Sequence, residues 1–569
     1  MGRKILTHLL GACAIAAAAT LGAGARAESN AGAYLAARVA AADSDYVAAA
    51  RYYSEALRRD PGNAELVDHA LVSHVAIGQT RDAVPIARLA RAARSDSKLV
   101  AMVGFADAGR EGDWDRLLAN LEAGASAGPL MDGLVRGWAE LGQGNQKGAF
   151  AAFEQTAQQP GLRSLALHQL ALALSIAGED ARAAEILALS PQDGLRQTRR
   201  GVILQAEVLG RIGKFNEAIA LLDTSFSTLD PGLVRLREAL SSGTVPRSAI
   251  ANDAAAGLAE AFFVTGAAIG GQADDTVTLM FFRLARYLDT KHVEAQLRSG
   301  TLLDRMGRYD LAMATFGQVP DDDPAYRVAA LGLAQAMRKS GAVAGAAGLL
   351  EDLSLRFETP DIRKIQGDVL RELGRYAEAR DAYSRSLELT GATVANRWFI
   401  YYSRGITYEK LGEWDLAEAD FRAALVLEPD QPQVLNYLGY GLAEQNIKLD
   451  ESLALLRRAV AASPDSGHIL DSLGWVLYRL GRYDESIEYL ERAAELDSTH
   501  PVIIDHLGDA YWRVGRRTEA RFQWRRALSF GPEDTQQTAI SAKLDRGLEA
   551  AQSMEIDEAT LQVAHGDRP

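Results

Sequence analysis

One pattern of residues returns at a nearly constant interval along this chain of 569 residues, and it constrains the fold more than any other feature. In the clearest copies, which start at Gly405 and Gly508, a small residue is followed seven positions later by Gly, then by Ala, and four residues after that by a bulky side chain. The small residues Gly405, Gly439, Gly474 and Gly508 are 34, 35 and 34 residues apart. A fixed interval of this length indicates one structural unit that stacks on copies of itself.

Each residue type in the pattern has a packing role. A small residue in the first helix of a unit lets the second helix approach closely, and the bulky residue fills the space that remains. Glycine ends the first helix because it adopts the left-handed conformation without steric cost. Proline stops the second helix at Pro429, Pro464 and Pro532. Chance amphipathic helices would have no fixed register, so the pattern predicts a helix–turn–helix repeat.

The turn glycine continues upstream after the rest of the pattern has faded. Its first five copies there are 34, 32, 34 and 35 residues apart, and an opening copy is anchored by Tyr46, Tyr53, Ala56 and Pro61. We therefore expect the N-terminal half to have the same architecture in degenerate form. The upstream turn glycines are Gly78, Gly112, Gly144, Gly178, Gly213, Gly307, Gly341 and Gly374.

The unit resembles the tetratricopeptide repeat, whose copies are about 34 residues long. This resemblance implies an all-α solenoid, a right-handed superhelix of helix–turn–helix repeats. Stretches rich in Pro, Gly or Asp at 224–252 and 266–276 indicate two segments joined by an irregular linker at 224–276. The expected parts are a degenerate N-terminal segment at 28–223, a C-terminal segment at 277–552 ending in a capping helix at 536–551, and a flexible acidic tail at 553–569.

The first 27 residues resemble a secretory signal peptide. Arg3 and Lys4 supply the positive start, residues 5–21 are mostly apolar, and Ala25-Arg26-Ala27 has the small residues of a cleavage site. We expect an exported, periplasmic protein whose mature chain begins near Glu28.

Cys13, the only cysteine, leaves an alternative open. The sequence Leu10-Gly11-Ala12-Cys13 loosely resembles a lipoprotein box, which would make the protein an outer-membrane lipoprotein anchored through Cys13. Against this, the apolar run before Cys13 is short and contains His8, and another apolar run follows. No other segment has the roughly 18 apolar residues of a membrane span, so contact with a membrane is expected only if Cys13 is lipidated.

The sequence predicts no enzyme, no cofactor and no metal site. It contains no GxSxG elbow, HExxH motif, phosphate-binding glycine loop or CxxC pair. His69 and His74 are five residues apart, and His500 and His506 are six apart, which does not place either pair on one helical face. The formal charge of −14, which becomes −17 without the three basic residues of the leader, disfavours binding to nucleic acid.

A solenoid offers instead a concave surface that is lined mainly by the first helix of each repeat. Aromatic rings interleaved with Asp and Arg suit a groove for partner proteins, because rings and guanidinium groups dominate binding energy. For Trp475 and Trp512 the groove and the core are equally supported, whereas Trp414 and Trp524 are expected in the core. The predicted groove contains Phe399, Tyr402, Ile406, Asn436, Tyr440, Asp471, Trp475, Tyr478, Arg479, Asp505, Asp509, Trp512 and Arg513.

A narrower resemblance covers about a fifth of the chain. The segments 435–440, 449–451, 470–479 and 506–509 are similar to a branch of bacterial envelope proteins with these repeats. Some members are adaptors that dock a carboxyl-terminal processing protease and bring peptidoglycan hydrolases to it. The resemblance implies a non-enzymatic periplasmic scaffold with such partners. The alternative is a structural assembly factor of an envelope machine, for polysaccharide export, pilus assembly or outer-membrane assembly.

Overall fold

The structure is a computed structural model that describes residues 30–225, 231–246, 248–391 and 397–549. In these ranges the regular secondary structure consists of 30 α-helices and no strands, which confirms the all-α class. The predicted signal peptide, Cys13 and the predicted tail lie outside the described residues.

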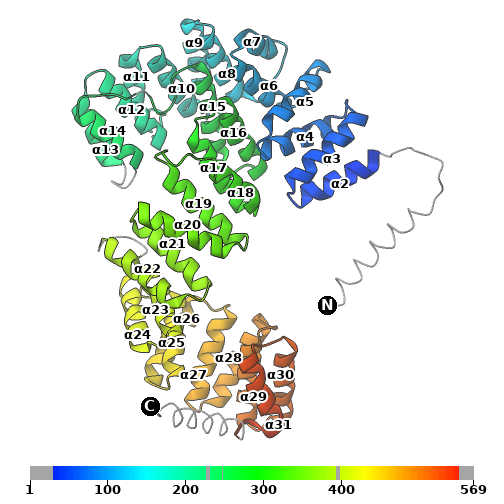
Figure 1. Cartoon of the computed structure of the whole chain (residues 1–569), viewed down its shortest axis with the longest axis vertical. Helices are drawn as coiled ribbons and strands as arrows, with labels where there is room; N and C mark the ends of the chain where they lie inside the picture. The colour runs from blue at the N-terminus through cyan, green and yellow to red at the C-terminus, as the bar shows by residue number, and fades with distance from the viewer. Residues whose placement is uncertain (1–29, 226–230, 247, 392–396, 550–569) are drawn as a thin grey trace, which may run out of the picture. The chain divides into compact units, whose positions relative to one another are not determined.

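The helices form two compact units, which divide after Ser340 (Figure 1). Within each unit, most successive helices pack against one another, as expected for a helical solenoid. The N-terminal unit contains α2 (Asn30–Ala42), α3 (Tyr46–Arg59), α4 (Ala64–Ala76), α5 (Thr80–Ala92), α6 (Lys98–Glu111), α7 (Trp114–Glu122), α8 (Pro129–Gly142), α9 (Gln146–Ala157), α10 (Arg163–Ile176), α11 (Asp180–Leu187), α12 (Arg199–Arg211), α13 (Phe215–Ser225), α14 (Pro231–Ser241), α15 (Ala254–Ile269), α16 (Asp275–Leu288), α17 (Val293–Arg305), α18 (Tyr309–Phe316) and α19 (Tyr326–Lys339). The C-terminal unit contains α20 (Val343–Arg356), α21 (Pro360–Glu372), α22 (Tyr376–Leu389), α23 (Arg397–Lys410), α24 (Trp414–Leu427), α25 (Pro432–Glu444), α26 (Leu449–Ala462), α27 (Gly467–Arg479), α28 (Tyr483–Leu496), α29 (Pro501–Arg513), α30 (Arg517–Ser529) and α31 (Asp534–Arg546).

The turn between paired helices has the predicted backbone conformation. The eight upstream turn glycines and the equivalent Gly412, Gly481 and Gly515 all have φ between 69° and 89°. In the repeat of α25 and α26 the equivalent residue is Asn446, with φ of 55°. Asparagine is one of the few other residues that adopt this conformation readily, so the turn survives without glycine.

The small residues of the pattern permit the close helix contacts expected of them. A Cβ atom on Gly508 would lie 2.6 Å from Trp524, and one on Gly405 would lie 2.7 Å from Phe421. Trp524 and Phe421 are fully buried, so these rings occupy the space that a side chain would need. The same close contact between a glycine and a large side chain is found for Gly137 and Phe153, Gly300 and Phe316, Gly367 and Tyr383, and Gly474 and Leu490.

Gly508→Leu is therefore expected to overpack the contact between α29 and α30 and to lower the free energy of unfolding by about 1–3 kcal/mol. Urea unfolding followed by circular dichroism measures the loss. Gly348→Leu is the matched control, because a Cβ atom on Gly348 in α20 would have no neighbouring atom within 4 Å and leucine has the higher helix propensity. Equal losses in the two variants would contradict the assigned register.

In the N-terminal unit, α15 and α16 pack against the first helices of earlier repeats. The helix α15 contacts α6, α8 and α10, and α16 contacts α4 and α6. Figure 1 shows this hairpin inside the arc formed by the preceding helices. A Cβ atom on Gly257 of α15 would lie 2.2 Å from the indole ring of Trp138 in α8, which is fully buried. The unit thus covers the inner face of these repeats with its own helices.

The structure corrects the predicted irregular linker at 224–276. This segment contains α14 and α15, and the compact units divide after Ser340 instead. Pro231 begins α14, a position where the missing N–H of proline costs nothing. The small residues near 266–276 form the end of α15 and a short turn, where a Cβ atom on Gly266 would lie 2.7 Å from Phe281. Residues that usually break helices therefore allow a tight hairpin here.

A buried ionic cluster joins α15 to its neighbours. Glu260 of α15 is fully buried, and its Oε2 atom lies 2.5 Å from Nη2 of Arg200 in α12 and 3.3 Å from Nε2 of His292. The Nε2 atom of His168 in α10 lies 3.8 Å from Oε1, and Arg200 also contacts Glu294 at 2.9 Å. Burial opposes ionisation of Glu260, but Arg200 and the two histidines outweigh it and hold the pKa of Glu260 well below its ordinary value.

Candidate partner-binding surface

The first helices of successive repeats in the C-terminal unit are α21, α23, α25, α27 and α29. Contacts between α25 and α27 and between α27 and α29 place these helices side by side. The predicted groove residues all lie on α23, α25, α27 and α29. The structure therefore brings them onto neighbouring elements, but it uses them in three different ways.

Trp475 on α27 lies at the centre of the first group. Its ring stacks on Tyr478 with centroids 4.8 Å apart and on His506 with centroids 4.1 Å apart. Its Nε1 atom donates a hydrogen bond to Oε1 of Glu444 in α25 at 2.5 Å. The indole is only partly buried, so part of this rigid ring remains in reach of a partner.

Three further side chains beside Trp475 have unused hydrogen-bonding capacity. Asn436 and Tyr440 are one turn apart on α25, and Oδ1 of Asn436 is buried without a donor in the described structure. Arg479, one turn after Trp475, is half-buried and makes no ion pair with a described residue. We call Asn436, Tyr440, Glu444, Trp475 and Arg479 the central patch. A buried acceptor without a donor is costly unless a ligand supplies the donor.

Two carboxylates, Glu444 in the central patch and Glu409 of α23 beside it, lie close enough for their charges to interact. Burial raises the pKa of Glu409 in α23, Lys410 acts in the opposite direction, and the nearby Glu444 raises it further. Burial also raises the pKa of Tyr440, and Glu444 adds to that effect. Only Arg479 brings a positive charge into the patch. The patch is thus suited to a partner segment that presents hydrogen-bond donors or a basic side chain.

Phe399 and Tyr402 belong to a separate aromatic cluster on α23. Their ring centroids are 6.1 Å apart, and Tyr402 lies 5.4 Å from Tyr437 of α25 in an edge-to-face arrangement. The ammonium group of Lys364 in α21 lies 4.7 Å from the centre of the Phe399 ring. Both predicted residues are half-buried, whereas Ile406 is buried. The rings chiefly join successive repeats to one another.

The structure uses Asp471 and Tyr478 for internal contacts, contrary to the prediction of a free groove surface. Oδ1 of Asp471 lies 2.9 Å from Nδ1 of His506, and both side chains are buried. Burial alone would lower the pKa of His506, but Asp471 outweighs it and raises that pKa. Tyr478 is 7% exposed, and its hydroxyl accepts a hydrogen bond from Nε of Arg513 at 3.0 Å. These contacts couple α27 to α29.

Asp505, Asp509 and Trp512 are covered by the end of the chain. Lys543 of α31 donates to Oδ2 of Asp505 and to Oδ2 of Asp509, both at 2.8 Å. Trp512 is 8% exposed and donates through Nε1 to Glu549 at 2.9 Å. The prediction of an open groove is therefore wrong for Asp505 and Asp509 in the described structure, and Trp512 takes the core alternative. The offsets within a repeat give no information about α31 and the residues just after it, which contact these three side chains.

Glu409, Glu444 and His506 were missed by the sequence projection. Glu409 and Glu444 follow the small residues Gly405 and Gly439 by four and five positions, in the last turn of the first helix. An extension of the projection by one helical turn would have found both carboxylates. His506 carried no such signal, because a lone histidine in a repeat is usually a packing residue.

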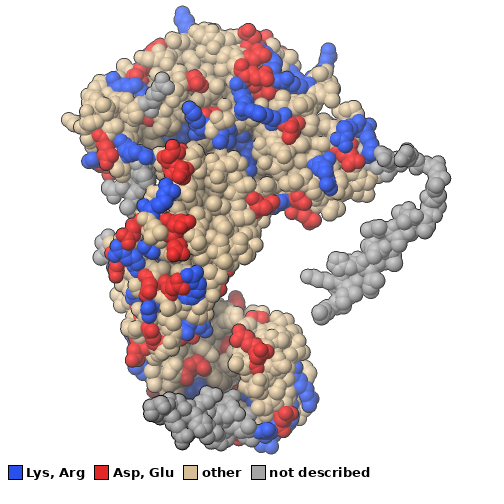
Figure 2. All heavy atoms as spheres, viewed as in Figure 1, with Lys and Arg blue, Asp and Glu red and all other residues tan. Residues whose placement is uncertain are grey.

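Other features of the described residues bear on the kind of site. On the face seen in Figure 2, acidic and basic side chains are interspersed, without the broad basic field that nucleic acid requires. The described residues contain no group of three or more His, Cys, Asp or Glu placed to hold a metal ion. None of the helices in the described ranges is both long and apolar enough to cross a membrane.

The repeat family is identified by four matches to models described as tetratricopeptide repeat. They cover residues 294–325, 365–393, 402–467 and 442–501, the last two of which span the helices of the central patch. The chain contains tetratricopeptide repeats. Proteins with these repeats are typically non-catalytic scaffolds that bind other proteins.

The TPR repeat-containing protein PA4667 of Pseudomonas aeruginosa is 29% identical to this chain over 193 residues. The match covers 33% of this chain and 31% of the relative, so the chain spans about a third of the relative's length.

Two solved structures are similar at 14% identity. A tetratricopeptide repeat protein from Parabacteroides merdae gives a TM-score of 0.37, with 43% of this chain and 96% of that chain covered. The hetero-tetramer Cut9–Hcn1 of the APC/C gives a TM-score of 0.38, with 92% and 97% covered.

Proposed function

We propose that this protein is a non-enzymatic adaptor that binds a segment of a partner protein at the central patch. The observations that carry the proposal are a half-buried indole bonded to Glu444, a guanidinium without an ion pair among the described residues and, two helical turns before Glu444 on α25, a buried amide oxygen without a donor. An extended segment or helix that presents a backbone N–H or a basic side chain would satisfy Asn436 and contact Glu444.

We place this adaptor in the periplasm, with a carboxyl-terminal processing protease and peptidoglycan hydrolases as its partners. The signal-like leader supports the location, and the similarity of 435–440 and 470–479 to envelope adaptors supports the partners. An adaptor of this kind raises the effective concentration of a substrate at its enzyme without chemistry of its own. A mature amino terminus near Glu28, determined on chain recovered from the periplasm, is the expected result for the location.

Trp475→Ala combined with Arg479→Ala should weaken binding of the protease by about 2 kcal/mol or more, because rings and guanidinium groups carry most interface energy. Binding is measured by biolayer interferometry with the full exported chain and the purified protease. Glu488→Ala is the control, since Glu488 is exposed on α28, the second helix of its repeat. Circular dichroism and the melting temperature show whether each variant is folded.

Three outcomes would count against the proposal. Equal weakening by the control, or weakening accompanied by unfolding, would mean that Trp475 and Arg479 act only through the fold. Absence of binding between the wild-type chain and the protease would remove that partner. Copurification of the chain in a fixed stoichiometry with an export or pilus complex would favour the structural assembly factor instead.

A further inference from the structure

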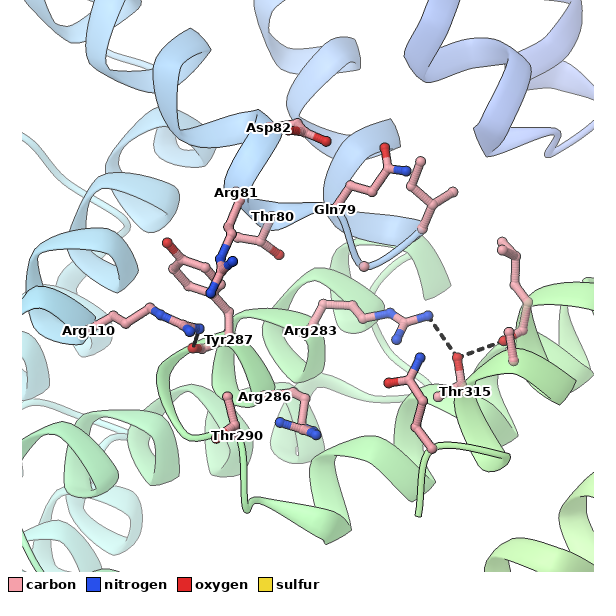
Figure 3. A pocket seen from close by; sticks show the side chains of 15 residues that line it. Gln79, Thr80, Arg81, Asp82, Arg110, Arg283, Arg286, Tyr287, Thr290 and Thr315 are labelled. Atoms are coloured by element: carbon pink, nitrogen blue, oxygen red, sulfur yellow. Dashed lines mark hydrogen bonds between the residues drawn. The ribbon is translucent and has the colours of Figure 1, made fainter. Parts of the chain in front are cut away.

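A second polar site lies wholly within the N-terminal unit, away from the central patch. It is a pocket of about 490 Å³ bounded by the first turn of α5, the end of α6, and helices α16 and α18 (Figure 3). Four arginines line it: Arg81, Arg110, Arg283 and Arg286. Asp82 is the one acidic residue of the lining, and Figure 3 shows its carboxylate pointing away from the guanidinium groups.

Arg283 is the most deeply placed of these arginines. It is 9% exposed, donates through Nε to the carbonyl of Ala76 at 3.2 Å, and donates through Nη2 to Oγ1 of Thr315 at 2.9 Å. No described carboxylate pairs with it. Burial lowers its pKa to about 10, and the charge of Arg286 adds to this effect. The protein therefore holds a buried positive charge here that only neutral groups solvate.

Arg110 and Arg286 extend the positive wall of the pocket. Arg110 donates to the carbonyl oxygen of Tyr287, and its guanidinium lies 4.5 Å from the centre of the Tyr287 ring. Arg286 donates through Nε to Oε1 of Gln296 at 2.5 Å. Burial lowers the pKa of Arg286, Asp289 acts in the opposite direction, and Arg110 lowers it further. Both guanidinium groups are thus held in place by neutral acceptors.

The first turn of α5 adds backbone donors to the same wall. Its N-cap residue, Gln79, makes no side-chain cap, and the Asp82 N–H donates to the Gln79 carbonyl at 2.9 Å, which leaves the amides of Thr80 and Arg81 without a capping acceptor. Gln79, Thr80 and Arg81 all line the pocket. The start of a helix favours negative charge, and backbone N–H groups there bind anionic oxygens.

Two other buried cations among the described residues have carboxylate partners. Arg200 contacts Glu260 at 2.5 Å, and Lys543 contacts Asp505 and Asp509 at 2.8 Å. A buried charge without a counter-charge is costly. An excess of basic residues does not explain the unpaired charge of Arg283, because the chain has 75 acidic and only 61 basic residues. Among the described residues, Arg283 is bonded to neutral groups and to no carboxylate.

We propose that this pocket binds a small polyanion whose carboxylate or phosphate oxygens are held by Arg81, Arg110, Arg283 and Arg286. Guanidinium groups form paired hydrogen bonds with both kinds of oxyanion, and the pocket has room for a metabolite-sized ligand. The ligand would bridge α5 and α6 to α16 and α18. Its binding stabilises the hairpin of α15 and α16 within the N-terminal unit.

Isothermal titration calorimetry of the full exported chain with pyrophosphate and, separately, with citrate tests this site. Binding of either supports the proposal, and a preference for one distinguishes phosphate from carboxylate chemistry. Arg81→Ala and Arg110→Gln should each weaken binding about tenfold or more, because each removes a charge-assisted contact. Arg58→Ala is the matched control, since Arg58 is exposed on α3 outside the pocket.

Hydrogen exchange gives a second measurement on the same samples. The bound anion should slow exchange in the first turn of α5 and in α16 of the wild type, and not in Arg81→Ala. The proposal is overturned if neither anion binds to the folded wild-type chain. It is also overturned if the control loses as much affinity as the pocket variants, which would indicate binding to surface charge in general.

Discussion

Arg200→Met should destabilise the packing of α15 in the N-terminal unit by about 3–5 kcal/mol, the usual cost of leaving a buried charge without its partner. Glu260 is fully buried and lies within 2.5 Å of the Arg200 guanidinium, so its carboxylate would remain in an apolar setting with two histidines as its nearest polar neighbours. Native-state hydrogen exchange of peptides from α12 and α15, in the full chain, measures the free energy of local opening.

The double variant Arg200→Met with Glu260→Gln separates charge from packing. We expect it to lose less stability than Arg200→Met alone, because removal of both charges abolishes the desolvation cost. The low pKa of Glu260 also predicts a direction for the effect of pH. The carboxylate contributes its stability above about pH 4.3, the ordinary value for Glu, and this contribution is lost as the pH falls further towards the folded pKa. A larger loss in the double variant than in the single one would contradict the charge argument.

The sequence predicted the repeats well because their cause is local. Gly508 and Trp524 are 16 residues apart, and a helix–turn–helix unit brings any two such residues together. The position of α15 depends instead on contacts across more than 100 residues, as between Gly257 and Trp138. No spacing within one repeat contains that information. The prolines and glycines of 224–276 therefore predict a linker, although Pro231 begins α14 and the glycines near 266–276 lie at the turn between α15 and α16.

For the candidate surface, the sequence predicts on which helix a residue lies but not whether its side chain is exposed. The helical offsets placed Asn436, Tyr440, Trp475 and Arg479 on adjacent first helices, and the structure has them there. Whether the side chain of such a residue is exposed depends on the helices that pack against it, and its position within the repeat does not show these. Asp509 has the same offset in its repeat as Trp475 has in the preceding one, yet Lys543 covers Asp509 from α31. Binding by the exposed residues stays a prediction.

Lys543→Met should detach α31 from the array, at a cost of about 3–5 kcal/mol in its docking free energy. Lys543 is 9% exposed and lies between two carboxylates, so its loss leaves Asp505 and Asp509 facing each other without a counter-charge. Hydrogen exchange in residues 534–546 measures the detachment. The exposed substitution Asp545→Asn, on the same helix, is the control and should leave exchange unchanged.

The pH dependence of that variant tests the cause of the detachment. Burial and the neighbouring Asp505 raise the pKa of Asp509 to about 6 even when Lys543 is present. A carboxyl group with a raised pKa stabilises the folded state while it is protonated, so its contribution is complete below about pH 4 and is lost as the pH rises through 6. Protonation of Asp509 should therefore slow exchange in α31 of Lys543→Met again when the pH is lowered from 7 to about 5, after correction for the intrinsic exchange rate. Detachment that is independent of pH would mean that the aliphatic packing of Lys543, and not its charge, holds the helix that covers Asp505, Asp509 and Trp512.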